Sequence, residues 1–394
     1  MKLEQIDKQN VLNTYARNYV NFKKGANATL TDDKENNYID FTSGIGVVSV
    51  GHGNKRVADT ICNQVSNITH ISNLYAIEPQ ALLAQKINKL SGYDMAMFFA
   101  NSGAEANEGA IKIARKYGEI NFDSKKYKIV TLGHSFHGRT ITTVKASGQK
   151  KMHSENFSPY PDGFSYKHKL DELYETIDDQ TVAVMIELIQ GEGGVQPFPK
   201  EDIQKLAAFC KDNGLLLIID EVQTGAYRTG EFLASNLYDI EPDIITMAKG
   251  MGGGVPIGCV MTKHKDIFEP GDHGSTFGGN YLSTAASLEV LNILDENKDS
   301  GVLDETIIYF NEKLKAFYES NTHLFYKEVG IGLMRGLRVN DEETLTKIYN
   351  NAFDNGLLVL KAGKITLRLL PPLTISKDEI DEGFTRLEKA VASI

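Results

Sequence analysis

The sequence predicts an α/β protein, with a mostly parallel central sheet covered by helices on both faces and a smaller α+β domain after it. Two observations support this prediction. Short, nearly continuous apolar and β-branched runs recur along the middle of the chain, and helical segments lie between several of them. This pattern is typical of parallel strands buried on both faces. From about Leu282 it changes to long amphipathic helices and weaker strands.

The elements of the large domain are predicted from their periodicity. Helical apolar spacing covers residues 55–71, 79–90 and 104–117, and a short apolar run occupies 94–100. A further helix is expected over Ile203–Asn213. The expected strands of the central sheet are Lys128–Leu132, Val182–Glu187, Leu215–Asp220, Ile244–Met247 and Ile257–Met261.

The C-terminal pattern predicts the second domain. Its expected elements are helices over Leu282–Glu296 and Val302–Glu319, strands near Gly332–Val339 and Ile365–Leu370, and a closing helix from Lys377. The first 45 residues show no clear pattern, and we expect them to pack with the small domain. The expected boundaries are an N-terminal segment 1–45, a large domain 46–285 and a small domain 286–394.

Composition and charge restrict the class of protein. Of 394 residues, 41% are hydrophobic and 24% charged, as in a globular protein. A net charge of −10 argues against a general nucleic-acid-binding or polybasic membrane surface. No apolar run reaches the ~18 residues of a membrane span, and the N-terminus shows no apolar signal core. The three cysteines stand far apart, without the spacing of a disulfide framework or a zinc site. We expect a cytoplasmic protein without nucleic acid, membrane or metal as partner.

Ligands of open α/β sheets bind at the carboxyl ends of the strands, so the residues that follow each strand are the candidates for chemistry. After the run 94–100, Ser102 can cap the next helix. Gly103 lets an anion approach the free N–H groups of the first turn, which includes Ala104. Both a phosphate site and an ordinary helix cap explain these residues, and the ordinary cap is the more common case.

Two further loops combine aromatic, charged and glycine residues. Phe136 could stack on a flat ring and Arg139 could bind a carboxylate, although a surface loop with an extended arginine explains them equally well. Glu192 lies among the three glycines of the segment 190–194. Those glycines indicate either close approach of the backbone to a ligand or a plain turn.

The next two strands end in an acid and a lysine. Asp220 follows a very apolar strand, where a buried acid needs a cationic partner such as a protonated ring nitrogen; a solvated strand end is the alternative. Lys249 stands beside the flexible loop Gly250–Gly254. Desolvation would lower its pKa and leave a nucleophilic amine, while an exposed lysine is the ordinary explanation. The loop 271–280 adds the hydroxyls of Ser275 and Thr276.

Taken together and in chain order, these features predict a pyridoxal 5'-phosphate site. A phosphate cradle, a stacking ring, an acid for a ring nitrogen and a lysine for covalent attachment stand at successive strand ends. The acid would stabilise the protonated pyridine, which makes the ring an electron sink. The lysine would carry the cofactor and then act as the base in the proton shift.

Over nearly its whole length the chain resembles the class III aminotransferases, which are pyridoxal phosphate enzymes of fold type I. The most specific part of the resemblance is the segment Asp220–Gly225 combined with Ala248–Gly250. The other matching segments are Ser43–Ile45, Gly51–His52, Asn101–Asn107, Phe136–Thr140, Gln190–Val195, Gly271–Asn280 and Arg368–Leu373.

The resemblance implies roles for the cofactor-binding residues. Lys249 would carry the cofactor, Asp220 would pair with the pyridine nitrogen, and Gln223 would approach the phenolic oxygen of the ring. Phe136 would stack on the ring. The phosphate would be held by Ser102, Gly103, Ala104 and, from the partner subunit of a homodimer, Thr276.

The resemblance also implies roles for substrate-binding residues. Arg139 would bind a substrate carboxylate, and Arg368 would bind the α-carboxylate of glutamate. Glu192 would neutralise Arg368 while the ω-amine substrate is bound, because one pocket must accept both a dicarboxylate and a side chain without the second carboxylate. Ser275 is expected to act with Thr276 across the subunit interface.

Within the family, the chain is most similar to the acetylornithine aminotransferases. Ile45 stands where ornithine aminotransferases usually carry a tyrosine that helps bind a free α-amino group, which favours an N-acylated substrate. The expected reaction moves the δ-amino group of N2-acetylornithine to 2-oxoglutarate in a ping-pong cycle, as in arginine biosynthesis, and yields glutamate. Ornithine, succinylornithine, 4-aminobutyrate or another ω-amine stays an alternative because of the unusual residues Gly46, Val48, Lys55, Leu188, Tyr227 and Tyr281.

Other reaction classes share parts of this pattern. A glutamate-1-semialdehyde aminomutase has the same fold and site, but it would exchange the amine without an added keto acid. A former transaminase retained as a scaffold protein is disfavoured because Asp220 and Lys249 are both present. A nicotinamide enzyme is disfavoured because no predicted strand is followed by GxGxxG.

Overall fold

The computed structural model describes residues 3–122 and 124–394, and a seven-stranded sheet forms its centre. The strand order is β4-β12-β11-β10-β7-β5-β6, and β12 alone runs antiparallel to its two neighbours. The prediction of a mostly parallel sheet is therefore confirmed. Its strands are β4 (Ala96–Ala100), β5 (Lys128–Leu132), β6 (Phe164–Lys167), β7 (Thr181–Ile186), β10 (Leu216–Asp220), β11 (Ile244–Met247) and β12 (Gly258–Thr262).

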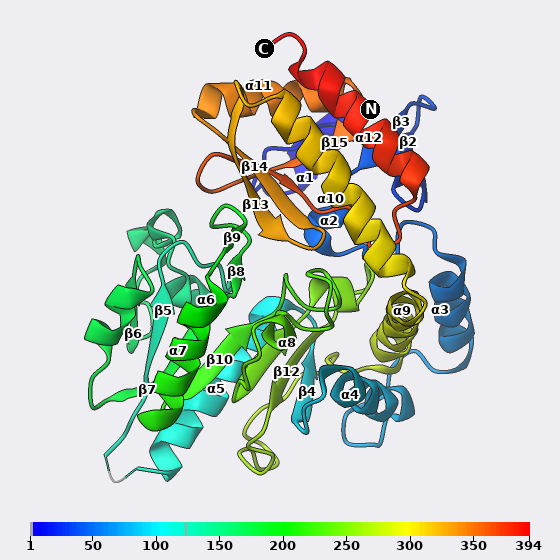
Figure 1. Ribbon diagram of the computed structural model, residues 1–394. Coiled ribbons are helices and arrows are strands. Elements are labelled where there is room, and N and C mark those ends of the chain that lie inside the picture. The colour runs from blue at the N-terminus through cyan, green and yellow to red at the C-terminus, as the bar shows by residue number, and fades with distance from the viewer. Residues whose placement is uncertain (1–2, 123) are drawn as a thin grey trace.

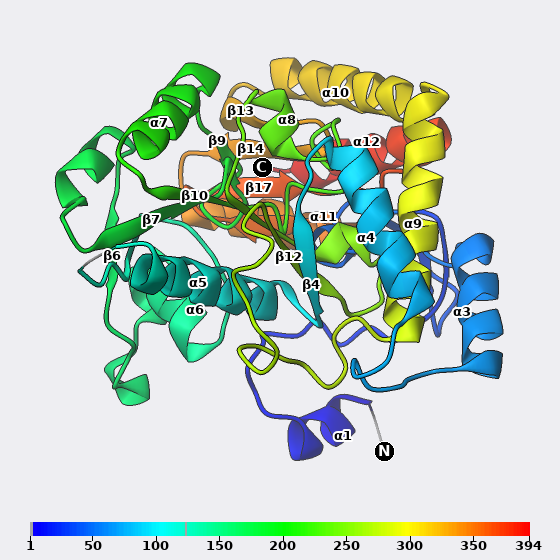
Figure 2. The ribbon, with the colours of Figure 1, turned by 90° about the horizontal axis from the view of Figure 1, so that it is seen from below.

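Helices cover both faces of this sheet (Figure 2). On one face, α5 (Gly103–Ile120) packs with Ile218 of β10, and on the other α7 (Lys200–Asp212) packs with Leu217 and Ile219. Alternate residues of one strand thus enter two separate cores, which explains why every residue of β7 and β10 is apolar except the last of β10 and the first of β7. Helices α6 (Ile141–Ala146) and α8 (Ala234–Leu237) are short.

Three helices form a layer beside β4. α3 (Lys55–Asn67) and α4 (Glu78–Ser91) both pack against α9 (Tyr281–Asp299). The sequence predicts the first of these helices to continue to Ile71, but it ends at Asn67, because Ile68 has extended backbone angles. Among the described residues, no helix is both long and apolar enough to cross a membrane.

A second, antiparallel sheet lies beside the large one with its own helices (Figure 1). Its order is β13-β14-β17-β16, and helices α10 and α12 pack together beside it, as do α11 and α12. The sequence prediction had no counterpart for β13 or α11. The elements are α10 (Val302–Ser320), β13 (Phe325–Ile331), β14 (Met334–Val339), α11 (Glu342–Asp354), β16 (Leu360–Ala362), β17 (Thr366–Leu369) and α12 (Lys377–Val391).

The N-terminal segment forms a third sheet that includes a strand from the other end of the chain. Ile39 of β3 pairs in parallel with Leu357 of β15, and the order is β1-β2-β3-β15. Helix α1 (Leu3–Asn10) buries no residue and stands apart from the rest of the chain (Figure 2). The boundaries 1–45, 46–285 and 286–394 stay a prediction. The remaining elements are β1 (Phe22–Ala26), β2 (Thr29–Asp32), β3 (Asn37–Asp40), α2 (Ser43–Gly46), β8 (Ile189–Gln190), β9 (Gln196–Pro197) and β15 (Leu357–Leu358).

Candidate active site

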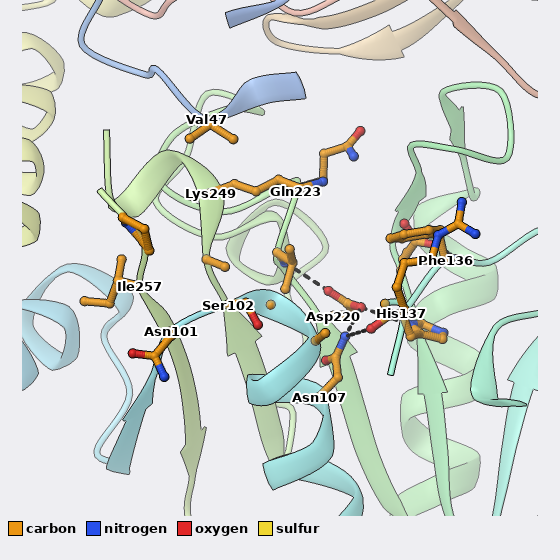
Figure 3. A pocket seen from close by; sticks show the side chains of 18 of the residues that line it. Val47, Asn101, Ser102, Asn107, Phe136, His137, Asp220, Gln223, Lys249 and Ile257 are labelled. Atoms are coloured by element: carbon orange, nitrogen blue, oxygen red, sulfur yellow. Dashed lines mark hydrogen bonds and ion pairs between the residues drawn. The ribbon is translucent and has the colours of Figure 1, made fainter. Parts of the chain in front are cut away.

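A cavity of about 400 Å³ opens at the carboxyl ends of the parallel strands, which is the edge where the sequence places the chemistry. Eight of the predicted site residues line it: Ser102, Gly103, Ala104, Phe136, Arg139, Asp220, Gln223 and Lys249. Figure 3 shows the lysine extending across the pocket towards Gln223, with Ser102 at the start of the helix beneath it. The other lining residues are Val47, Asn101, Asn107, His137, Gly138, Glu187, Val222, Ala248, Gly254, Val255, Pro256 and Ile257.

The first turn of α5 forms one wall of the pocket. Ser102 caps the helix, since its Oγ accepts a hydrogen bond from the backbone N–H of Glu105 at 3.2 Å. A side chain at Gly103 would not fit, because its Cβ would stand 2.6 Å from Cγ1 of Val222. The helix N-terminus therefore reaches the pocket with bare backbone, and its N–H groups and dipole suit a phosphate.

Asp220 ends β10 at the floor of the pocket and is almost fully buried. Its Oδ2 accepts hydrogen bonds from Nδ2 of Asn107 at 2.8 Å and pairs with Nδ1 of His137 at 2.8 Å (Figure 3). Its Oδ1 accepts from the N–H of Val222 at 3.0 Å. These partners hold the carboxylate in one orientation, so it can face a cationic ring nitrogen without rotating.

Lys249 follows β11 in an unusual backbone conformation. Its φ is +46°, in the left-handed region that non-glycine residues seldom adopt, and such strain is concentrated at functional sites. Its side chain is half-buried and lines the pocket. Burial lowers the pKa of Lys249, and the acids Glu192 and Asp220 only partly counteract that effect. The lysine is thus disposed to supply a neutral amine.

Phe136 and Arg139 lie at the opposite wall. The Arg139 guanidinium stands 5.6 Å from the centre of the Phe136 ring, and its side chain is exposed at the mouth. Beneath them, Glu187 is buried and accepts a hydrogen bond from the N–H of Phe136 at 2.9 Å. Burial raises the pKa of Glu187 to about 7, so this carboxyl group titrates near neutral pH.

Glu192 and Arg368 form an ion pair beside the cavity. Nη1 of Arg368 lies 2.6 Å from Oε1 of Glu192 and donates to Oε1 of Gln223 at 3.3 Å. Arg368 is only 2% exposed, and its Nε is buried without a partner among the described residues. Burial would raise the pKa of Glu192, but Arg368 outweighs burial and keeps that pKa below its ordinary value. A guanidinium with an unused N–H can receive a second carboxylate.

The loop 271–280 does not line this cavity. Thr276 is exposed, whereas Ser275 makes contacts within the chain: its Oγ accepts from Nδ2 of Asn101 at 3.1 Å. Asn101 itself lines the pocket, so the loop stands next to the site without entering it. A role of Thr276 in a partner subunit stays a prediction.

Sequence reasoning missed three polar residues of the site: Asn107, His137 and Glu187. The first had a recognisable signal, because Asn107 lies on the same helical face as Ala110 and Ala114, where a polar residue needs a buried partner. His137 pairs with an acid from another strand end, and no local pattern announces such a pair. Glu187 closes a strand that looks like an ordinary solvated end.

The residues present fit pyridoxal 5'-phosphate. Gly103 packs against Val222 and presents bare backbone N–H groups at the helix start, which suit a phosphate, and Asp220 offers an oriented carboxylate at the pocket floor. The lowered pKa of Lys249 suits covalent attachment to an aldehyde, which requires a neutral amine. The orphaned Nε of Arg368 suits an anionic substrate group. The helix start thus suits the phosphate, Asp220 suits the protonated ring nitrogen, and Lys249 suits the aldehyde of the cofactor.

Comparisons with known proteins show the family to which the chain belongs. The model of the family described as "Aminotransferase class-III" matches residues 12–391. An acetylornithine aminotransferase of Wolinella succinogenes is 57% identical over 99% of this chain and all of its own length. The structure is similar to an ornithine aminotransferase of Toxoplasma gondii, described with partial occupancy of PLP at its active site (TM-score 0.92, 30% identity, 99% of this chain and 94% of that one). It is also similar to the N-acetylornithine aminotransferase of Stenotrophomonas maltophilia (TM-score 0.82, 29% identity, 99% of each chain).

Proposed function

The chain belongs to the class-III aminotransferase family, and from this premise we propose that it transfers the δ-amino group of N2-acetylornithine to 2-oxoglutarate. It is a transaminase that depends on pyridoxal 5'-phosphate. The observation that carries the substrate proposal is the 57% identity to a curated acetylornithine aminotransferase over the full length of both chains. Such a reaction belongs to arginine biosynthesis, and we place the enzyme in the cytoplasm.

The bound cofactor supplies an electron sink that makes the carbon bearing the substrate amine acidic. With the cofactor bound, Lys249 Nζ would accept the proton from that carbon and later donate it back, a role that burial favours by lowering the pKa of the lysine. Asp220, held by His137 and Asn107, would keep a proton at the ring nitrogen of the bound cofactor. Phe136 would stack on the ring and shield it from water.

Two arginines give the pocket its preference for acidic substrates. Arg139 at the mouth binds one carboxylate, and Arg368 binds the α-carboxylate of glutamate or 2-oxoglutarate. When the amine donor is bound, Arg368 stays paired with Glu192, so no unpaired cation faces a side chain that lacks the second carboxylate. The same pocket can thereby serve both half-reactions.

We further propose a homodimer in which Thr276 reaches the phosphate of the partner's site. Loops 68–77 and 271–280 are tied together, because Nδ2 of Asn73 donates to the carbonyl of Gly278 at 2.8 Å. They expose Leu74 (89%) and Phe277 (60%), and adjoining apolar residues of this size are typical of interfaces. A Leu74→Glu, Phe277→Glu variant should sediment as a monomer and bind the cofactor more weakly. Ile308→Glu, on the exposed face of α10, is the matched control.

Absorbance spectroscopy tests the main proposal. The purified enzyme should show a visible cofactor band that disappears when N-acetylornithine is added and returns with 2-oxoglutarate, and Lys249→Ala should lack this band. Ornithine, succinylornithine and 4-aminobutyrate are the competing donors. Turnover with N-acetylornithine no faster than with ornithine would refute the substrate assignment, and turnover without 2-oxoglutarate would indicate an aminomutase.

A further inference from the structure

Arg228 is a buried arginine that the reaction described above does not use. It lies in the loop after β10, five residues beyond Gln223, and is 2% exposed. Within the part of the chain that the structure describes, no carboxylate lies within ion-pair distance of it. Burial lowers the pKa of Arg228 to about 9, and Asp40 is the acid that opposes this shift. A buried cation without a paired acid is costly, so a specific contact must be the reason for its presence.

The contacts of Arg228 are two backbone carbonyls of the small sheet. Its Nη1 donates to the carbonyl of Pro371 at 2.6 Å and to that of Leu333 at 3.1 Å. In return, the N–H of Leu333 donates to the carbonyl of Arg228 at 3.0 Å. Leu333 comes directly before β14 and Pro371 shortly after β17, which pair with each other. One guanidinium therefore joins the loop of the large sheet to two neighbouring strands of the small sheet.

The two hydrogen bonds of Arg228 to Leu333 and Pro371, called the clamp below, lie close in sequence to Arg368. Pro371 is three residues beyond Arg368, on the segment that leaves β17. Gln223 contacts the guanidinium of Arg368 from the same loop that carries Arg228. The loop thus holds β17 at two points, one at the Arg368 side chain and one at the backbone after it. A change in the contact at Pro371 would therefore move the side chain of Arg368.

The N-terminal segment holds the opposite side of the same stretch. Ser43 Oγ donates to the carbonyl of Leu370, and the N–H of Leu370 donates to the carbonyl of Phe41. Arg228 is the group that supplies the matching contact from the large sheet. Backbone at residues 370–371 is therefore fixed from both sides, which suits a side chain that must meet substrate within a fraction of an ångström.

We propose that Arg228 is a positioning residue that fixes Arg368 for the dicarboxylate substrate through the carbonyl of Pro371. The proposal rests on the proposed function in one respect, that Arg368 binds the α-carboxylate of 2-oxoglutarate. It implies that the two half-reactions differ in their dependence on Arg228. The amine donor meets Arg368 only while that residue is paired with Glu192, so its binding does not require the clamp.

The test is Arg228→Lys, which keeps the charge but replaces the planar guanidinium, whose Nη1 donates to both carbonyls, by a shorter and more flexible ammonium group. We expect the KM for 2-oxoglutarate to rise about tenfold or more, while the KM for the amine donor and the cofactor affinity change less than about twofold. Glutarate, a dicarboxylate that cannot react, should bind about tenfold more weakly to Arg228→Lys by calorimetry. Arg335→Lys is the matched control, because Arg335 is a half-buried arginine of the small sheet that pairs with Glu328.

A double-variant cycle separates positioning from general stability. In an Arg368→Gln background, Arg228→Lys should cause no further loss of glutarate affinity. Equal losses for both substrates, unchanged glutarate affinity, or additive effects in the cycle would overturn the proposal. If Arg228→Lys does not fold, Ser43→Ala tests the same stretch from its other side, and unchanged glutarate affinity there would overturn it too. The glutarate measurements concern only the binding of the dicarboxylate. They therefore test the role of Arg228 even if the amine donor is a compound other than N-acetylornithine.

Discussion

Replacing Gly103 by alanine tests the phosphate cradle at atomic scale. The added Cβ would stand 2.6 Å from Cγ1 and 2.9 Å from Cγ2 of Val222, where ordinary contacts begin at 3.4 Å. The start of α5 or the Val222 side chain must therefore retreat by several tenths of an ångström, and both line the pocket. Overpacking of this kind costs about 1–3 kcal/mol.

That cost should appear mainly as weaker cofactor binding. Because 1.4 kcal/mol corresponds to a factor of ten, we expect the dissociation constant of pyridoxal phosphate to rise about 5–150-fold. The assay is a titration of the cofactor-free enzyme, followed by the visible absorbance. Val222→Ala removes both methyl groups that the new Cβ meets, so the double variant should recover most of the affinity relative to Val222→Ala alone. Unchanged affinity in Gly103→Ala, or strictly additive losses in the double variant, would refute the reasoning.

Two further substitutions probe the buried charges. Glu192→Gln leaves Arg368 without its anionic partner, so the KM for N-acetylornithine should rise about tenfold or more while 2-oxoglutarate binding is retained; stopped-flow measurement of each half-reaction checks this. The pKa of Glu187 is raised to about 7 in the folded protein, against an ordinary 4.5. As the pH rises, Glu187 therefore loses its proton in the unfolded chain before it does so in the folded protein, which lowers the free energy of unfolding. The midpoint temperature of unfolding of the wild type should therefore fall between pH 4.5 and 7 relative to that of Glu187→Gln. The same dependence of the midpoint on pH in both proteins would contradict the raised pKa of Glu187.

Local periodicity was sufficient to predict the central sheet. Lys128–Leu132 and Ile244–Met247 have the predicted bounds, because both strands are mostly apolar and buried and polar turns delimit them. β13 escaped prediction for the opposite reason. It is an edge strand whose Tyr326 and Lys327 are exposed, so its sequence alternates too weakly to stand out.

The sequence was sufficient to predict those residues of the candidate site that directly follow a strand. The positions of Asp220 and Lys249 followed from topology, since parallel strands end at the same edge. The contacts that orient them did not follow, because His137 and Asn107 come from other segments. Glu221 shows the same limit: no cation among the described residues pairs with it, but it accepts hydrogen bonds from the N–H and hydroxyl of Ser235 at 2.7 Å, which satisfies its buried carboxylate.

The pairing of β3 with β15 has a consequence for synthesis on the ribosome. Ile39 leaves the exit tunnel long before its partner Leu357 is added to the chain. At roughly 5–20 residues per second, the first strands wait for some tens of seconds with an open edge. The waiting strand β3 has only four residues, of which Asn37 and Asp40 are polar, and a short polar edge resists pairing with neighbouring chains during the delay.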